Sequence, residues 1–513
     1  MNLNINEFQS KVLACWLGKN IGGTLGAPFE WKRQLNNVSF YTQDLGGEPA
    51  YNDDLDVQLL WLIALEEQGI EIDAHLLAEY WCLYLTPHWA EYGTAKINLR
   101  AGLLPPCSGT MFNDYKDSCG CFLRSEIWAC LAPGNPRLAV RYAIQDGIID
   151  HGNGEGVYAE TFCAALESAA FVIQDIPRLI EIALSYIPEN CGVAGAVREA
   201  VACYQNGLSW QAARDCILEK YRGLMFFNMR SAISDRDFEK GFGSGKRGWD
   251  APSNIGMIVI GLLYGEGDFG KSICTAVNCG EDTDCTGATL GSLFGILHGM
   301  EGIPQAWIEP IGRKIRTACL NLGELGYYGN QLPADVDELT QRVIRLTRQV
   351  IERHNLPLTI TEAPTNLSQL SIDSLLAGDS AKELYRDANA MRFHFDFFDI
   401  LLDYGEEGPV IRPSQPKTLL LRIDNHYKVQ ANLGIHWYTP NNWSVFPSPD
   451  GYSFSFPAGF GRQLEIPFQV SIEHPDRPLM RAAIEITMSG RPTVMLVPVM
   501  LLNGSLITDR PEC

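Results

Sequence analysis

The spacing of apolar residues changes once along this chain, and that change limits its fold more than any other feature. Apolar residues recur at helical intervals in Val57–Glu67, Ala159–Val172 and Ile255–Tyr264. Between Phe8 and about Glu352 no strand-like alternation of any length interrupts this pattern. We therefore expect a mainly α chain that begins with an all-α domain of many short helices, several of them buried on every side.

The C-terminal third has a different character. From about Met391 the chain contains short β-branched or aromatic runs, such as Leu419–Ile423 and Leu464–Ile472, separated by turn residues. Strands spaced roughly 8–12 residues apart are typical of a β-sandwich. The sequence thus predicts a helical domain over residues 1–355, a polar linker over 356–390 and a smaller all-β, immunoglobulin-like sandwich over 391–513.

The charge balance narrows the possible partners. The chain has 61 acidic and 40 basic residues, a net charge of −21. Nucleic acids and anionic membrane surfaces are bound by clustered Lys and Arg, so we expect neither as a partner. The 15 cysteines include no CxxC pair, Met1–Ser10 is polar, and no apolar run approaches the ~20 residues of a membrane helix. These features predict reduced thiols and a cytoplasmic location.

The most informative motif is Gly280-Glu281-Asp282-Thr283-Asp284-Cys285-Thr286, which precedes a run of small residues. Carboxylates at positions i and i+2 in a tight turn are hard oxygen ligands of the kind that Mg²⁺ and Ca²⁺ prefer. The alternative is a helix N-cap in which acids complement the dipole. The small residues after the turn would let its helix pack deeply and bring the turn to the centre of a bundle.

A second acidic group, Asn52-Asp53-Asp54-Leu55-Asp56, stands immediately before the amphipathic helix that begins near Val57. Its carboxylates repel one another unless a cation or solvent relieves them. Taken alone, a solvated cap explains the group as well as a metal site does. The presence of two such motifs in one chain favours a shared site.

A third motif is the glycine-rich stretch Gly22–Glu30 (GGTLGAPFE), whose part Gly22–Pro28 we expect to break the helical pattern. Glycines permit close approach of the backbone to a ligand, and a glutamate at the end of such a loop can act as a general acid or base. The stretch is not a phosphate P-loop, because no Gly-Lys-Ser/Thr follows it.

These three segments, in this order, resemble the ADP-ribosylglycohydrolase family, which includes the dinitrogenase-reductase-activating glycohydrolases. The resemblance covers about residues 8 to 350 and also includes the Arg124 segment, Tyr158–Glu160 and the stretch Ile303–Trp307. It implies an all-α orthogonal helical bundle with one or two Mg²⁺ ions in a central cleft, with Mn²⁺ or Ca²⁺ as other possible ions.

The resemblance also implies roles for individual residues. Glu30, Asp53 and Asp284 would take part in catalysis. The metal ligands would be Asn52, Asp53, Asp54, Asp282, Asp284 and Cys285. The sequence departs from the family pattern at three positions. Gly23, in the glycine-rich stretch, stands where an Asp is usual, and Asn52 and Cys285, in the two acidic motifs, stand where Thr is usual. A thiol is a soft ligand and a poor partner for Mg²⁺.

Four further residues are candidates for substrate binding. They are His151 and Glu155 in a polar loop before a helix, Asn98, and Trp249 after a glycine-rich loop. The alternatives are a turn cap for His151 and Glu155 and an exposed loop for Trp249. In the β domain, Trp437, Tyr438 and Trp443 could stack on a sugar, although a place in the sandwich core explains them as well.

Three hypotheses follow for the function. The first is a metal-dependent glycohydrolase that cleaves a ribosyl or ADP-ribosyl bond on a protein or a small molecule, in which case the partner is the ADP-ribosylated or small-molecule substrate. The second is a glycosidase that acts on a different sugar. The third is a non-catalytic, ligand-binding relative with a degenerate metal site.

Overall fold

The computed structural model describes residues 1–223, 233–242, 250–378, 385, 390–460 and 463–506. The chain divides into two compact units. The helical unit contains residues Met1–Lys96 and Phe112–Leu384, and the β unit contains Ile97–Met111 and Tyr385–Cys513. The short segment of residues 97–111 therefore belongs with strands that follow it by almost three hundred residues, although it lies within the predicted helical part of the sequence.

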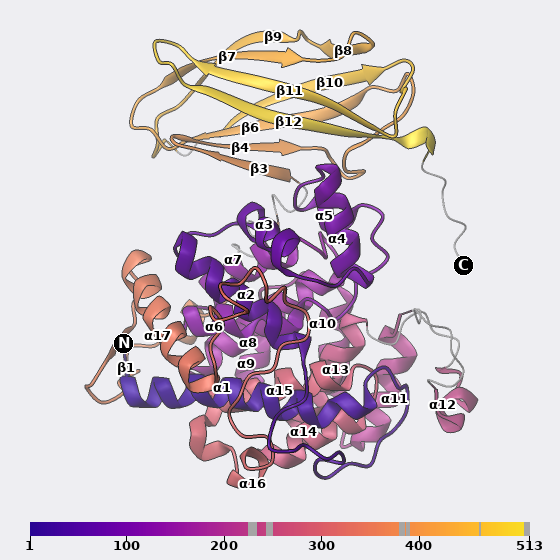
Figure 1. Cartoon of the computed structure of the whole chain (residues 1–513), viewed down its shortest axis with the longest axis vertical. Coiled ribbons are helices and arrows are strands. Elements are labelled where there is room, and N and C mark those ends of the chain that lie inside the picture. The colour runs from indigo at the N-terminus through magenta and orange to yellow at the C-terminus, as the bar shows by residue number, and fades with distance from the viewer. Residues whose placement is uncertain (224–232, 243–249, 379–384, 386–389, 461–462, 507–513) are drawn as a thin grey trace. The chain divides into compact units, whose positions relative to one another are not determined.

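The mainly helical character of the first part is confirmed (Figure 1). The described helices are α1 (Ile5–Gly26), α2 (Asp53–Gln68), α3 (Ala74–Tyr84), α4 (Ala90–Ala101), α5 (Cys107–Thr110), α6 (Glu126–Leu131), α7 (Pro136–Gly147), α8 (Glu155–Ala170), α9 (Ile176–Leu184), α10 (Gly192–Gln205), α11 (Trp210–Tyr221), α12 (Asp235–Glu239), α13 (Ala251–Tyr264), α14 (Phe269–Asn278), α15 (Thr283–His298), α16 (Gln305–Ile308) and α17 (Val336–Arg353). A short parallel pair, β1 (Asn2–Asn4) and β2 (Thr359–Thr361), joins the beginning of the chain to the segment after α17.

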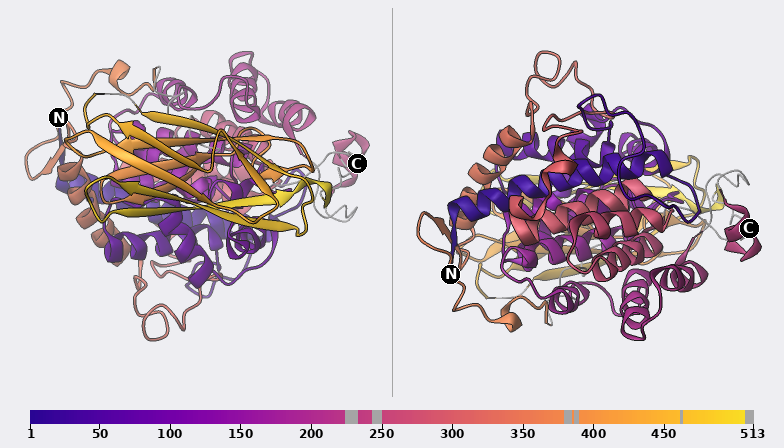
Figure 2. Two further views of the ribbon diagram at one scale, coloured as in Figure 1. Left: turned by 90° about the horizontal axis from the view of Figure 1, so that it is seen from above. Right: turned by 90° about the horizontal axis from the view of Figure 1, so that it is seen from below.

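Helices α1 and α15 lie side by side, and their backbones touch (Figure 2). A Cβ on Gly18 would lie 2.0 Å from the carbonyl oxygen of Gly291, and one on Gly22 would lie 1.9 Å from that of Gly287. Any side chain at these positions would force the helices apart. The glycines therefore serve helix packing, and the predicted break at Gly22–Pro28 is wrong up to Gly26, where α1 ends. The deep packing expected of α15 is confirmed.

The β unit is built from two five-stranded sheets with the orders β3-β4-β6-β10-β8 and β5-β12-β11-β7-β9 (Figure 1). All the described strand pairs in these sheets are antiparallel except β5–β12. The strands are β3 (Ala390–Phe395), β4 (Phe398–Asp403), β5 (Val410–Ile411), β6 (Lys417–Asn425), β7 (Ala431–Tyr438), β8 (Trp443–Phe446), β9 (Asp450–Ser455), β10 (Leu464–Ile472), β11 (Leu479–Met488) and β12 (Val494–Asn503). The all-β prediction is confirmed.

Both sheets contribute to one apolar core. Leu421 and Val470 from one sheet belong to the same buried cluster as Ile484 and Val497 from the other, and Leu103 from the 97–111 segment joins them. Because strand side chains alternate between the two faces of a sheet, this core takes every second residue of β7 and of the first part of β12. A sandwich is the arrangement that buries one face of each sheet.

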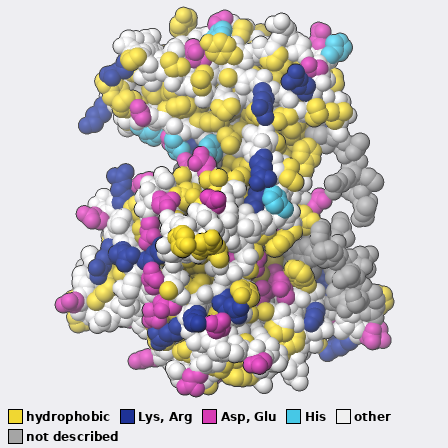
Figure 3. Space-filling model, viewed as in Figure 1, with side chains coloured by type: hydrophobic (Ala, Val, Ile, Leu, Met, Phe, Trp, Pro, Cys, Tyr) yellow, Lys and Arg dark blue, Asp and Glu magenta, His cyan; other side chains and the backbone are white. Residues whose placement is uncertain are grey.

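The aromatic residues of the β unit separate into two groups. Trp437 and Trp443 lie in the core cluster, whereas Tyr438 is half exposed. On the face drawn in Figure 3, hydrophobic side chains occupy much of the surface of the β unit, while acidic and basic side chains are intermixed over the helical unit. Trp437 and Trp443 therefore serve the packing of the sandwich core, the alternative to sugar stacking that the sequence analysis gave.

No described helix has the length and hydropathy needed to span a membrane.

Candidate metal centre and active site

The packing of α1 against α15 places the ends of two predicted motifs together. The Thr283 hydroxyl, at the start of α15, donates a hydrogen bond of 2.8 Å to the carbonyl oxygen of Gly26, at the end of α1. Glu30 follows one short 3₁₀ turn (Ala27–Phe29) later, and Asp282 directly precedes α15. Segments about 250 residues apart in the sequence are thus joined at a buried point.

Carboxylates from all three motifs converge at this point. Glu30, Asp282 and Asp284 offer ligand atoms that lie within 4.8 Å of one another, and so do Asp54, Asp284 and Cys285. Asp53 lies within electrostatic reach, since it raises the pKa of Glu30 and of Asp284. We refer to Glu30, Asp53, Asp54, Asp282 and Asp284 as the acidic cluster.

Two helix N-termini face the acidic cluster. Asp53 and Asp54 lie in the first turn of α2, and Asp284 lies in the first turn of α15. The partial positive charge at a helix N-terminus stabilises a nearby carboxylate by about 0.3–1 kcal/mol, up to ~2 kcal/mol when it is partly buried. The partial positive charges of two helix N-termini are too small to neutralise five carboxylates.

Several oxygens of the cluster have no hydrogen-bond partner among the described residues. They are Oδ2 of Asp54, Oδ1 of Asp282 and Oδ1 of Asp284, and each of these residues is more than nine-tenths buried. An unpaired buried carboxylate oxygen is costly, because it has lost its water without gaining a donor. Carboxylate oxygens are the donors that hard divalent cations prefer, so these residues fit a metal ion.

The pKa values of the carboxyl groups in the acidic cluster also indicate that positive charge is lacking there. Burial and the neighbouring carboxylate of Asp284 raise the pKa of Glu30 to about 10. Burial, and then Glu30, raise the pKa of Asp282 to about 7. Burial also raises the pKa of Asp54 and Asp284 well above the usual range for aspartate. Bringing these groups together without a cation therefore favours protons on them at neutral pH.

Asn52, a predicted ligand, caps α2. Its Oδ1 accepts a hydrogen bond of 2.7 Å from the backbone N–H of Asp54. Its Nδ2 lies 2.0 Å from the place that a Cβ on Gly23 would take, so a side chain at position 23 has no room. Gly23 and Asn52, two departures from the family pattern, are thus neighbours in space. The Asn52 side chain occupies the space that a side chain at position 23 would need.

Other buried carboxylates of the helical unit form ion pairs. The Nζ of Lys19 lies 2.8 Å from the carboxylate of Glu126, with both side chains buried. Arg124 lies 2.9 Å from Asp146 and 2.6 Å from Asp150, again without solvent exposure. These carboxylates have a cationic partner in the protein, which distinguishes them from the acidic cluster.

His151 is fully buried and held on both sides. Its Nε2 lies 3.0 Å from the hydroxyl of Ser118, and its Nδ1 lies 3.1 Å from Asp150. Ser118 and Asp150 are also fully buried. The ring therefore belongs to the network around Arg124, and its proposed contact with substrate stays a prediction.

Glu155 caps a neighbouring helix. Its two carboxylate oxygens accept hydrogen bonds from the backbone N–H groups of Gly192 (2.7 Å) and Val193 (2.9 Å), at the start of α10. This cap satisfies donors that have no partner within α10. Both oxygens are engaged by the protein, and a role for Glu155 in substrate binding also stays a prediction.

The other two substrate-binding candidates, Asn98 and Trp249, stay predictions. Asn98 belongs to the β unit, where its Nδ2 donates to the carbonyl oxygens of Ser108 (2.8 Å) and Met111 (2.7 Å) and so closes the 97–111 segment. Trp249 lies outside the described residues. For both, the predicted role is neither supported nor contradicted.

One residue at the cluster escaped the sequence analysis. Cys119 lies beside Asp282 and Cys285, and the ligand atoms of these three residues lie within 4.8 Å of one another. Its Sγ donates a hydrogen bond of 2.5 Å to Oδ2 of Asp282. Cys119 follows neither a metal-binding spacing nor a motif, so only the folded chain reveals it.

Comparison with known proteins agrees with this arrangement. The family model described as ADP-ribosylglycohydrolase matches residues 4–347. The chain belongs to the ADP-ribosylglycohydrolase family. The matched stretch contains the whole acidic cluster together with Cys119 and Cys285, whereas the strands β3 to β12 lie beyond it.

Individual relatives of this ADP-ribosylglycohydrolase family member are distant. An uncharacterized protein of Archaeoglobus fulgidus is 27% identical over 213 residues, which cover 38% of this chain and 64% of that protein. A solved structure described as an ADP-ribosylglycohydrolase-related protein complex is 18% identical with a TM-score of 0.42, and covers 67% of this chain and 99% of its own. A FixG-related protein from Vibrio parahaemolyticus is 12% identical with a TM-score of 0.17, and covers 21% of this chain and 98% of its own.

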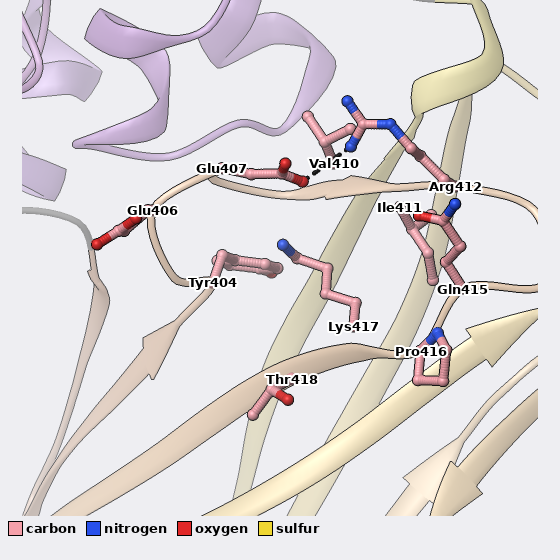
Figure 4. Close-up of a pocket in the computed structure, with 10 residues that line it drawn as sticks. All are labelled: Tyr404, Glu406, Glu407, Val410, Ile411, Arg412, Gln415, Pro416, Lys417 and Thr418. Carbon is pink, nitrogen blue, oxygen red and sulfur yellow. Dashed lines mark hydrogen bonds and ion pairs between the residues drawn. The ribbon is translucent and has the colours of Figure 1, made fainter.

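The β unit has a hollow of its own, of about 310 Å³ (Figure 4). Tyr404, Lys417 and an ion pair of 2.8 Å between Arg412 and Glu407 line it. Burial lowers the pKa of Lys417. Its acidic and basic groups balance each other, unlike those of the acidic cluster, so this hollow does not call for a cation.

Proposed function

We propose that this protein is a metal-dependent glycohydrolase that cleaves a ribosyl or ADP-ribosyl glycosidic bond on a protein or a small molecule. Its membership of the ADP-ribosylglycohydrolase family supports the hydrolysis of a glycosyl bond. A divalent cation of the Mg²⁺ type, held by Asp53, Asp54, Asp282 and Asp284, is the cofactor in this proposal.

One observation carries the proposal. Three segments that are distant in the sequence bring the carboxylates of Glu30, Asp54, Asp282 and Asp284 together, with Asp53 within electrostatic reach. No described lysine or arginine forms an ion pair with any of the five. The free energy cost of burying like charges is large unless a cation compensates them. A purely structural role would be served better by apolar side chains, so the arrangement favours a working site.

Glu30 is suited to proton transfer. It is the only glutamate of the cluster and is half-buried, and without a bound cation its pKa is raised to about 10. Cleavage of a ribosyl C1′ bond passes through an oxocarbenium-like state and needs a proton donor at the leaving group and an oriented water molecule. Its half-buried carboxyl group is the proton donor in this proposal. A bound divalent cation would supply orientation and Lewis acidity for the substrate and the water.

The test is a panel of substrates with and without added divalent cation. ADP-ribosyl-arginine, ADP-ribosyl-serine, ADP-ribose phosphate esters and simple ribosides are incubated with the full chain, and released ADP-ribose or ribose is measured by chromatography. We expect turnover of one of these classes, and its loss in the presence of EDTA. Turnover of unrelated glycosides alone, or of none of these compounds, contradicts the proposal.

Glu30→Gln tests the proton donor. Because glutamine keeps the shape but cannot give up a proton, we expect kcat to fall about 10²–10⁴-fold with a much smaller change in KM. Glu309→Gln, at an exposed position of the same unit, is the control and should leave both constants unchanged. A Glu30→Gln enzyme with an unchanged kcat would remove Glu30 from the reaction.

A further inference from the structure

Two thiols meet the carboxylates at the acidic cluster. Cys119, Asp282 and Cys285 offer ligand atoms within 4.8 Å of one another, and all three residues are buried. Cys285 belongs to a second group as well, since its Sγ lies 3.4 Å from Oδ1 of Asp54. Two sulfurs and two carboxylates, from three separate places in the sequence, thus meet at Cys285.

The spacing of these atoms suits a four-coordinate ion. Zn–S bonds are about 2.3 Å and Zn–O bonds about 2.0–2.2 Å, so the ligand atoms of a tetrahedral zinc lie roughly 3.3–3.8 Å apart. Cys285 joins two groups, Cys119–Asp282–Cys285 and Asp54–Asp284–Cys285, and within each group the ligand atoms lie within 4.8 Å of one another. Ordinary side-chain rotation can bring such atoms to the spacing of a bound ion. The remaining carboxylates would complete the surroundings.

Unsatisfied oxygens point to a ligand here. Oδ1 of Asp282 and Oδ2 of Asp54 have no hydrogen-bond partner among the described residues, although both side chains are almost completely buried. The hydrogens of the two thiols are directed at the other oxygens of the same carboxylates. Replacement of those two protons by one divalent cation would satisfy all four groups.

Two other cysteine-containing groups in the described residues lack this property. In the group of Cys121, Asp150 and His151, the guanidinium of Arg124 already lies 2.6 Å from Asp150. In the group of Glu199, Cys203 and Cys216, Lys220 lies 2.8 Å from Glu199. A protein cation balances the charge in each, so neither needs a metal ion.

We propose that Cys119 and Cys285 are ligands of the metal centre, so that this protein binds a thiophilic divalent cation such as Zn²⁺ in preference to Mg²⁺. The proposal rests on the proposed function in one respect, namely that the acidic cluster binds a cation. Thiolate ligands favour Zn²⁺ over Mg²⁺, since sulfur is soft and Mg²⁺ demands hard oxygen ligands in an octahedral arrangement. The substitution of Cys285 for the usual Thr would then change the ion.

The experiment uses the full chain stripped of metal and titrated with Co²⁺ as a spectroscopic stand-in for Zn²⁺. We expect the sulfur-to-cobalt charge-transfer absorption in the near ultraviolet that marks Co²⁺–thiolate bonds. In a separate calorimetric titration we expect Zn²⁺ to bind on the order of 100-fold or more tightly than Mg²⁺.

The matched variants are C119S/C285S and, as a control, C274S, whose thiol is also buried but belongs to none of the cysteine-containing groups described above. We expect the double variant to lose the charge-transfer absorption and its preference for Zn²⁺, and the control to keep both. The single variant C285T, which restores the residue usual in the family, should lose part of the absorption. X-ray absorption of the zinc-loaded wild type, with sulfur in the first coordination shell, gives the same answer without any substitution.

The outcomes separate this inference from the proposed function. Tight Mg²⁺ binding with no sulfur signal in the wild type overturns the thiolate ligands and leaves the glycohydrolase proposal standing. A sulfur signal that survives in C119S/C285S also overturns it, because other cysteines then hold the ion. The absence of any divalent cation binding overturns both proposals together.

Discussion

The helical unit and the β unit bury different kinds of side chain. The core of the β unit is almost entirely aliphatic and aromatic, with Arg422, at 9% exposure, as the one ionisable side chain of its strands in the buried class among the described residues. The helical unit buries Lys19, Arg124 and Arg214 completely, together with many carboxylates. Since the burial of charge is costly, the helical unit bears a cost in stability that the apolar core of the β unit avoids.

The largest effect is expected from removal of a carboxylate from the acidic cluster, which should lower activity strongly without lowering stability. We expect Asp284→Ala to lower kcat/KM on the order of 10⁴-fold, equivalent to about 5 kcal/mol of transition-state stabilisation. Stability in the absence of metal should stay the same or rise, because the variant has one repelling carboxylate fewer. Turnover assays and urea unfolding in EDTA measure the two effects. A strongly destabilised metal-free variant would show that Asp284 is structural.

The paired charges should behave in the opposite way. Arg124→Met leaves Asp146 and Asp150 buried without their cation, and we expect it to lower the free energy of unfolding by about 3–5 kcal/mol. Arg313→Met, which breaks an exposed ion pair with Asp337, is the control and should cost at most about 1 kcal/mol. Urea unfolding followed by far-ultraviolet circular dichroism compares them. Equal effects of the two substitutions would remove the distinction between buried and exposed pairs.

A substitution in the apolar core tests the other side of the comparison. Ile484 on β11 is fully buried between the two sheets, and Ile484→Ala should lower the free energy of unfolding by about 2–4 kcal/mol through lost burial and a cavity. We expect no change in kcat/KM for the folded enzyme, because the acidic cluster lies in the other unit. Loss of turnover by a fully folded Ile484→Ala protein would show that the site depends on the sandwich.

A smaller effect should appear in the pH dependence of stability. Burial lowers the pKa of Lys11 to about 8, while its Nζ donates to the carbonyl oxygens of Ile296 and Leu297. Between about pH 8 and 10 the unfolded chain then binds a proton that the folded chain has released, so stability from this group rises with pH. Lys11→Met should flatten the rise by roughly 1–2 kcal/mol over that window. Parallel slopes for the two proteins would contradict the lowered pKa.

The sequence predicted the helices and strands better than it predicted which of them pack against one another. The helical and β regions, and the burial of the helix that follows Asp282, follow from local periodicity and residue size. Which helix would pack against α15 could not be predicted, because the glycines of α1 look like a loop until their partners Gly287 and Gly291 are known. The same glycines explain why the predicted break was wrong.

The candidate site shows the same limit. The acidic residues could be identified because two acidic motifs and the glycine-rich stretch occur in one chain in the order typical of a known family, and the structure brings Glu30, Asp54, Asp282 and Asp284 together. Cys119 could not be identified, since a lone buried thiol resembles any small core residue. Glu155 shows a related limit. It caps α10, a helix distant from it in the sequence, and no pattern in the residues around Glu155 indicates this contact.

The assignment of residues 97–111 to the β unit has a practical consequence for anyone who divides this protein. The polypeptide passes between the two units at residues 96/97, 111/112 and 384/385, so a single cut cannot separate them. A truncated chain that stops at Leu384 would leave Leu103 and Cys107 without the strands that bury them, and it would expose apolar surface prone to aggregation. A short polar loop in place of residues 97–111 should make such a fragment better behaved.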